Sequence, residues 1–242
     1  MTKNRDEYIP ALKYRLLTCL YDPLLHWILR ESKFKHGLVE QACIESGHRV
    51  LDLGCGTGTL ALLIKRTQQE AEVVGLDGDP KVLEIAKAKV DRSGQEITMD
   101  YGMAFELPYP DDSFDRVLSS LLFHHLTREN KVRTLTEVFR VLRPGGQLHV
   151  ADWGTPSNIS MRIAFLSVQM LDGFKTTADN VNGLLPELFS SAGFEVGQES
   201  AQYMTISGTL SLYSAVKPRR RVTAGAATNS SPGLSFLSSR SN

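Results

Sequence analysis

The feature that most constrains the fold is a glycine-rich turn between a short apolar run and a helical one. The run 50–53 (VLDL) has the composition of a buried strand, Gly54, Gly56 and Gly58 follow at alternate positions, and 60–65 begins an amphipathic helix. Glycine has no Cβ, so such a loop can turn sharply and a ligand can lie against its backbone. The pattern predicts a strand, loop and helix that bind a ligand at the helix N-terminus. A tight turn without a ligand is the alternative.

The same alternation of strand and helix continues through most of the chain. Strand-like runs lie at 72–76, 96–100, 115–120 and 147–151, and helical runs at 80–90, 127–142, 159–171 and 180–192. Repeated units of this kind predict an α/β fold with a doubly wound, mostly parallel sheet and helices on both faces. The last two strand-like runs, 194–200 and 203–216, nearly adjoin, which predicts an antiparallel hairpin.

The chain divides into three parts around this core. Residues 1–46 have leucines at helical spacing and are expected to form N-terminal helices, 47–217 form the core, and 218–242 are expected to be a disordered tail. Within the core, 154–186 is a looser inserted segment. Because 1–46 and 154–186 are rich in apolar and aromatic residues, we expect them to form a lid over an apolar substrate, with ordinary packing on the core as the alternative.

Composition excludes several classes of partner. Lys plus Arg equal Asp plus Glu at 27 each, so nothing indicates a nucleic-acid binder. The 3 cysteines form no Cys-x-x-Cys pair, which argues against disulfides or zinc, so we expect no metal and a cytoplasmic protein. No apolar run reaches the roughly 18 residues that a membrane span needs. Peripheral contact of the first helix with a membrane is the less favoured alternative.

Two acidic residues indicate what the glycine loop binds. The spacing Gly-x-Gly-x-Gly differs from the Gly-x-Gly-x-x-Gly of dinucleotide sites. Asp52, two residues before Gly54, would repel a diphosphate but tolerate a cationic amino-acid group. Asp77, at the end of the next strand, can accept hydrogen bonds from two ribose hydroxyls. Its alternative role is to cap the helix that starts at Pro80, which Asp79 can do equally well.

Five blocks of sequence carry a family resemblance. They are 50–58 (VLDLGCGTG), Asp77, 107–115 (LPYPDDSFD), 123–126 (FHHL) and 137–146 (EVFRVLRPGG). In this order they resemble class I S-adenosylmethionine-dependent methyltransferases, above all the ubiquinone and menaquinone biosynthesis C-methyltransferases. The resemblance implies a Rossmann-like sheet of seven strands, of which the last is antiparallel, and S-adenosyl-L-methionine as cofactor.

The resemblance also implies which residues bind the cofactor. Asp52 and the loop would face the methionine part, Asp77 the ribose, and the region of Met103 the adenine. The implied set is Asp52, Gly54, Cys55, Gly56, Gly58, Asp77, Gly78, Met103 and Ala104. Two positions depart from the family: Gly78 stands where a bulky residue often packs on adenine, and Met103 stands near where an acid often contacts the adenine amino group.

Catalytic residues are less well defined by the sequence. If the acceptor must lose a proton, a histidine is a suitable base, and His124 and His125 follow the fourth strand at the edge where ligands bind. Capping and packing of that turn is the alternative role for both, and Asp152 after the fifth strand is equally ambiguous.

We therefore expect an enzyme that methylates a small molecule, quinone-like or lipid-like. A non-catalytic protein that binds the same cofactor is the alternative, and a nicotinamide oxidoreductase is disfavoured. The acceptor atom and the oligomeric state stay open.

Overall fold

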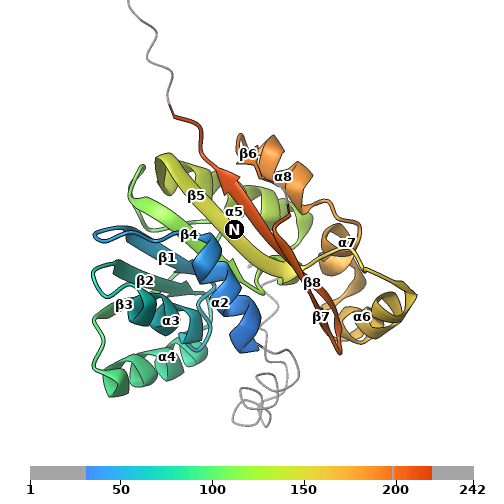
Figure 1. Ribbon diagram of the computed structural model, residues 1–242, viewed down its shortest axis with the longest axis horizontal. Helices are drawn as coiled ribbons and strands as arrows, with labels where there is room; N and C mark the ends of the chain where they lie inside the picture. The colour runs from blue at the N-terminus through green and yellow to red at the C-terminus, as the bar shows by residue number, and fades with distance from the viewer. Residues whose placement is uncertain (1–30, 198, 220–242) are drawn as a thin grey trace, which may run out of the picture.

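The computed structural model describes residues 31–197 and 199–219 of the 242-residue chain (Figure 1). Its helices are α2 (Glu31–Gln41), α3 (Thr59–Thr67), α4 (Pro80–Ser93), the 3₁₀ helix η1 (Phe123–His125), α5 (Arg128–Val141), α6 (Ile159–Asp172), α7 (Phe174–Val181) and α8 (Leu185–Ser191). Its strands are β1 (Arg49–Leu53), β2 (Glu72–Asp77), β3 (Ile97–Tyr101), β4 (Phe114–Ser120), β5 (Leu142–Trp153), β6 (Glu195–Val196), β7 (Ala201–Thr205) and β8 (Gly208–Val216).

The described strands form one mixed sheet in the order β3-β2-β1-β4-β5-β8-β6, with β7 also paired to β8. The pairs from β3 to β5 are parallel, and β8 runs antiparallel to β5. The order reverses between β1 and β4, which makes the carboxyl ends of these strands the switch point where open α/β sheets bind ligands. The predicted α/β fold, its doubly wound sheet and its antiparallel last strand are confirmed. The sheet of the described residues has eight strands and not the seven expected, because the predicted run 203–216 forms parts of both β7 and β8.

The hairpin at the end of the sheet begins later than the sequence suggested. The run 203–216 is broken by a turn at Ile206 and Ser207, so β7 and β8 form the hairpin. Gly208, with φ 141°, lies just beyond the turn, and the Ser-Gly pair was the signal for it. Between β6 and β7 the chain stays on the same edge of β8, because the Gly197 N–H donates to the Ser214 carbonyl.

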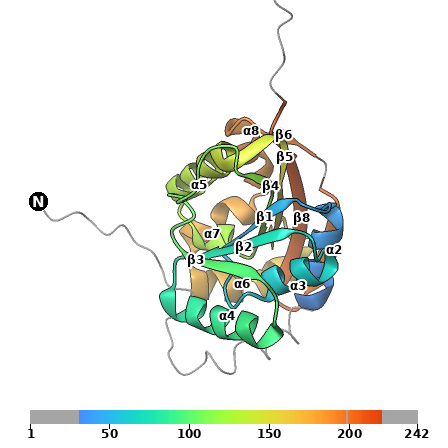
Figure 2. The same ribbon diagram turned by 90° about the vertical axis from the view of Figure 1, so that its left-hand side faces the viewer.

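Helices cover both faces of the sheet, as predicted (Figure 2). On one face Phe34 and Leu38 of α2 join Leu60 of α3 and Ala86 of α4 in an apolar cluster. On the other face the cluster includes side chains of α5 and α8. The predicted helix 180–192 is instead the end of α7 and the separate helix α8, because Gly183 adopts φ 69° between them.

The outer parts of the predicted organisation are only partly described. Residues 1–30 and 220–242 lie outside the described residues, so the expectations for the first helices and most of the tail stay predictions. α2, the described part of 1–46, packs on α3 and β5. The inserted segment 154–186 contains α6, α7 and the start of α8.

Candidate active site

The glycine loop joins β1 to α3 and is shaped by three glycines in the left-handed region. The φ angles of Gly54, Gly56 and Gly58 are 72°, 53° and 75°, which other residues adopt only at a cost. A Cβ on Gly58 would lie 3.3 Å from Cβ of Ala86 in α4, whereas one on Gly56 would meet nothing within 4 Å. Gly58 therefore lets two helices approach each other, and Gly56 leaves open space above the loop.

Asp77 ties this loop to the end of β2. Its Oδ2 accepts the Gly56 N–H at 2.8 Å and its Oδ1 accepts the Asp79 N–H at 2.9 Å. Burial raises the pKa of Asp77, and the N–H groups of Asp79 and Gly56 oppose the rise. A carboxylate has about four acceptor positions, so Asp77 retains acceptor capacity for a ligand after these bonds. The helix-capping role belongs to Asp79, whose carboxylate accepts the Lys81 N–H at 2.9 Å.

Asp52 lies in β1 with only 1% of its surface exposed. Its Oδ2 has no hydrogen-bond partner within the described part of the chain. Burial raises the pKa of Asp52 to about 7, although the Lys35 charge and the Ala61 N–H lower it. An unsatisfied buried carboxylate oxygen is costly, so a ligand that brings a positive charge or a donor to this edge would stabilise it.

The two departures from the family pattern meet in space. A Cβ built on Gly78 would lie 2.9 Å from Sδ of Met103, so the thioether already fills the space of a side chain at position 78. Gly78 and Met103 therefore depend on each other, because a larger residue at position 78 would collide with Met103. Met103 thus supplies an apolar surface at the end of β2, where the sequence alone suggested that a side-chain wall was missing.

Two other predicted residues point away from the loop surface. Cys55 is buried among apolar side chains, with Sγ 4.0 Å from Sδ of Met99, and burial raises the pKa of its thiol. Ala104 is 9% exposed and packs in the cluster on the other face of the sheet. At these two positions only the backbone remains for a ligand.

The carboxyl ends of β4 and β5 carry a second polar group of residues. His124 is 3% exposed, and its Nδ1 lies 2.8 Å from Oδ1 of Asp152, which is fully buried. Asp152 also accepts the N–H groups of Phe123 and Trp153, both at 2.7 Å, and the side-chain amide of Asn180 at 3.1 Å.

These donors determine the ionisation of Asp152. Burial alone would raise the pKa of Asp152, but His124 and the Trp153 N–H bring it below its ordinary value, so the carboxylate stays ionised. An ionised Asp152 can only accept in this hydrogen bond, so Nδ1 of His124 is the donor and Nε2 is the nitrogen left to accept a proton or bind a ligand.

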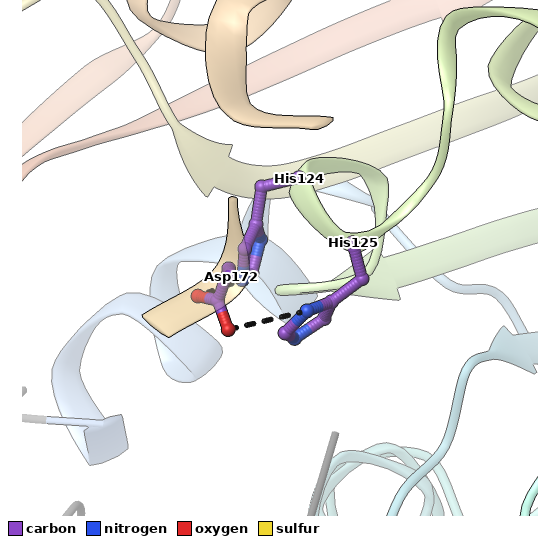
Figure 3. A group of neighbouring side chains, drawn as sticks. All are labelled: His124, His125 and Asp172. Atoms are coloured by element: carbon purple, nitrogen blue, oxygen red, sulfur yellow. Dashed lines mark ion pairs between the residues drawn. The ribbon is translucent and has the colours of Figure 1, made fainter. Parts of the chain in front are cut away.

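Asp172, the last residue of α6, lies beside both histidines (Figure 3). Its carboxylate is 3.7 Å from Nε2 of His124 and 3.6 Å from Nδ1 of His125, and the two imidazole rings are 4.0 Å apart. Burial lowers the pKa of His125 to about 3, so this ring is neutral, and burial raises the pKa of Asp172. Sequence reasoning missed Asp172 and Asn180, since they lie in the insertion and no motif marks them.

Comparison with known proteins agrees with this geometry. Residues 50–146 match the family model described as a methyltransferase domain. An uncharacterized methyltransferase of Synechocystis is 34% identical over 166 residues, which are 69% of this chain and 76% of the relative. A demethylmenaquinone methyltransferase of Thermus thermophilus is 38% identical over 126 residues, and the alignment spans 52% of this chain and 56% of that relative.

A solved structure, a SAM-dependent methyltransferase of Aquifex aeolicus, has the same fold. It superposes with a TM-score of 0.63 at 18% identity and covers 84% of this chain and 97% of its own. The chain therefore belongs to the family of S-adenosylmethionine-dependent methyltransferases. Among the described helices, none combines the length and apolar character needed to cross a membrane.

Proposed function

We propose that the protein binds S-adenosyl-L-methionine at the carboxyl ends of β1 and β2 and transfers its methyl group to a small-molecule acceptor. The observation that carries this proposal is the junction of Gly56 and Asp77, where an oriented carboxylate with free acceptor positions borders the open space over the loop. Asp77 would hold the ribose, and the orphaned Oδ2 of Asp52 would favour the cationic amino-acid part. Met103 would pack on the adenine.

The chemistry divides between the cofactor and the chain. The cofactor, when bound, supplies a methyl group that is already activated by a positively charged sulfur, so alignment of donor and acceptor is the main task of the protein. Nε2 of His124, held by Asp152 through Nδ1, takes the proton that a hydroxyl or ring-carbon acceptor must lose. Because Asp152 stays ionised, it stabilises the positive charge that His124 then carries.

The acceptor class follows from the insertion and the relatives. α6 ends at the site with Asp172, yet it leaves Ile159, Ile163 and Met170 exposed at 80%, 62% and 78%. We propose that this segment covers an apolar acceptor, quinone-like as for the demethylmenaquinone methyltransferases or lipid-like. The free thiols Cys43 and Cys55 support a cytoplasmic location.

The test is a transfer assay with radiolabelled methyl donor and a panel of quinone-like, lipid-like and unrelated phenolic acceptors. Labelled product with the first two groups, together with release of S-adenosylhomocysteine, is the expected result. Cofactor binding without product from any acceptor would favour the non-catalytic alternative on the same scaffold. A panel response limited to the phenols would overturn the proposed acceptor class and leave the transfer activity in place.

A further inference from the structure

His124, His125 and Asp172 bring three electron-pair donors together at the end of α6. One ligand atom from each lies within 4.8 Å of the others. The carboxylate oxygens of Asp172 are 3.7 Å and 3.6 Å from the two imidazole nitrogens, too far for good hydrogen bonds. In a tetrahedral site with bonds of about 2.0 to 2.1 Å, neighbouring ligand atoms lie roughly 3.3 to 3.4 Å apart. The two Asp172 distances, one to each carboxylate oxygen, are close to this spacing, and the full set of ligand atoms, within 4.8 Å, would draw closer around a shared ion.

The residues behind this cluster are those that a metal site needs. Metal-binding histidines usually donate their second N–H to a carboxylate, which orients the ring and increases its basicity. His124 does this through Nδ1 to Asp152, and Asp152 is itself held by the Phe123 N–H and the Asn180 amide. The lone pair of Nε2 is thereby directed towards Asp172.

The cluster is also open to solvent on one side. The His124 side chain is 4% exposed, but those of His125 and Asp172 are 22% and 24% exposed, so an ion can enter past them. Two imidazoles and one carboxylate form a donor set used by zinc and by other first-row transition metals, and three protein ligands leave a position for water.

We propose that His124, His125 and Asp172 bind one divalent transition-metal ion of the Zn²⁺ or Co²⁺ type. This proposal goes beyond the proposed methyl transfer. It also revises the expectation of no metal, because nothing in the sequence indicated that Asp172 lies beside the histidines. One consequence rests on the proposed function: a bound ion occupies the Nε2 lone pair that would accept the proton, so Zn²⁺ would inhibit transfer to an acceptor that must lose a proton.

Cobalt provides the direct test, because bound Co²⁺ in a four- or five-coordinate site has a strong visible absorption. The substitutions Cys19→Ser and Cys43→Ser remove competing thiols from the tag-free full-length protein. This protein is titrated with Co²⁺ by absorption spectroscopy and with Zn²⁺ by calorimetry. We expect one ion per chain and a raised melting temperature. Asp172→Asn, which keeps the size of the side chain, and His125→Gln should each weaken binding at least about tenfold, as should Asp152→Asn behind His124.

The matched control is His48→Ala, since His48 also lies 3.7 Å from a carboxylate, that of Glu45, but belongs to no group of three possible metal ligands among the described residues. It should leave binding unchanged. The proposal is overturned if no ion binds stoichiometrically, or if Asp172→Asn and His125→Gln, shown to be folded by circular dichroism, bind Co²⁺ like the parent. Parallel titration with S-adenosylhomocysteine separates the metal-site proposal from the proposed function, because the metal ion and S-adenosylhomocysteine can each bind when the other does not.

Discussion

The two halves of the ligand-binding edge are built in different ways. At β1 and β2 the site joins the backbone of the glycine loop to the Asp52 and Asp77 side chains, which come from consecutive strands close to that loop in the sequence. At β4 and β5 it consists of side chains from separate segments: His124 follows β4, Asp152 lies in β5 and Asp172 ends α6. The first half suits a ligand with a fixed shape, and the second suits proton transfer or metal binding, where individual side chains decide the chemistry.

The two halves also differ in how their buried carboxylates are compensated. Asp52 and Asp77 have pKa values raised by burial, so without a ligand they are incompletely compensated. Asp152 is as deeply buried as Asp52, but its hydrogen-bond donors lower its pKa. Under the proposed function a ligand would complete the cofactor half, whereas Asp152 in the other half is already satisfied by donors of the protein.

The largest expected effect is on the rate of methyl transfer, which a change at the β4 and β5 half should lower without changing cofactor affinity. His124→Ala should lower the rate of methyl transfer by about 10²- to 10⁴-fold, the usual contribution of a general base. Calorimetry should show unchanged affinity for S-adenosylhomocysteine, because His124 lies outside the glycine loop. Full activity in this variant, with an acceptor that must lose a proton, would remove His124 from the mechanism.

The next effect concerns the stability of the cofactor half. The pKa of Asp52 is about 7 in the folded chain and near 3.8 when unfolded, so its stabilising contribution is present below about pH 4 and is lost as pH rises through 7. Asp52→Asn should therefore increase stability without ligand at pH 8 by on the order of 3 kcal/mol. Urea unfolding at pH 5 and pH 8 measures this, and an equal effect of the substitution at both pH values would contradict it.

A smaller effect distinguishes ligand binding from helix capping. Asp77→Ala should weaken binding of S-adenosylmethionine by about 1.5 to 3 kcal/mol, the range for lost charge-assisted hydrogen bonds. Asp79→Ala is the control, since it removes the cap of α4 and should cost about 0.5 to 2 kcal/mol of stability with little change in affinity. If the two variants bind the cofactor equally well, Asp77 does not hold the ribose.

The smallest effect tests the arrangement of Gly78 and Met103. Met103→Ala should weaken cofactor binding by about 0.3 to 1.5 kcal/mol, the range for a sulfur packed on an aromatic ring. Met170→Ala, at a position that is 78% exposed, is the control and should have no effect. Calorimetry resolves both, and equal affinities for the two variants would place the adenine elsewhere.

The accuracy of sequence reasoning follows the same division between the halves. The alternation of strands and helices, the tight glycine turn and the position of Asp77 at the end of a strand depend on neighbouring residues and on glycine chemistry, so the sequence predicted them. The approach of Met103 to Gly78, and of Asp172 and Asn180 to the histidines, depends on how distant segments pack. The hairpin turn at Ile206 was within reach of sequence reasoning, since Ser207 and Gly208 marked it.

The most direct test of the central claim, that the β1 and β2 half is a complete cofactor site, is a calorimetric titration of the full chain. Its ligands are S-adenosylmethionine, S-adenosylhomocysteine and NAD⁺. We predict one-to-one binding of the two sulfur compounds and no binding of NAD⁺, because Asp52 opposes a diphosphate. Absence of binding by either sulfur compound, or preference for NAD⁺, would contradict the account.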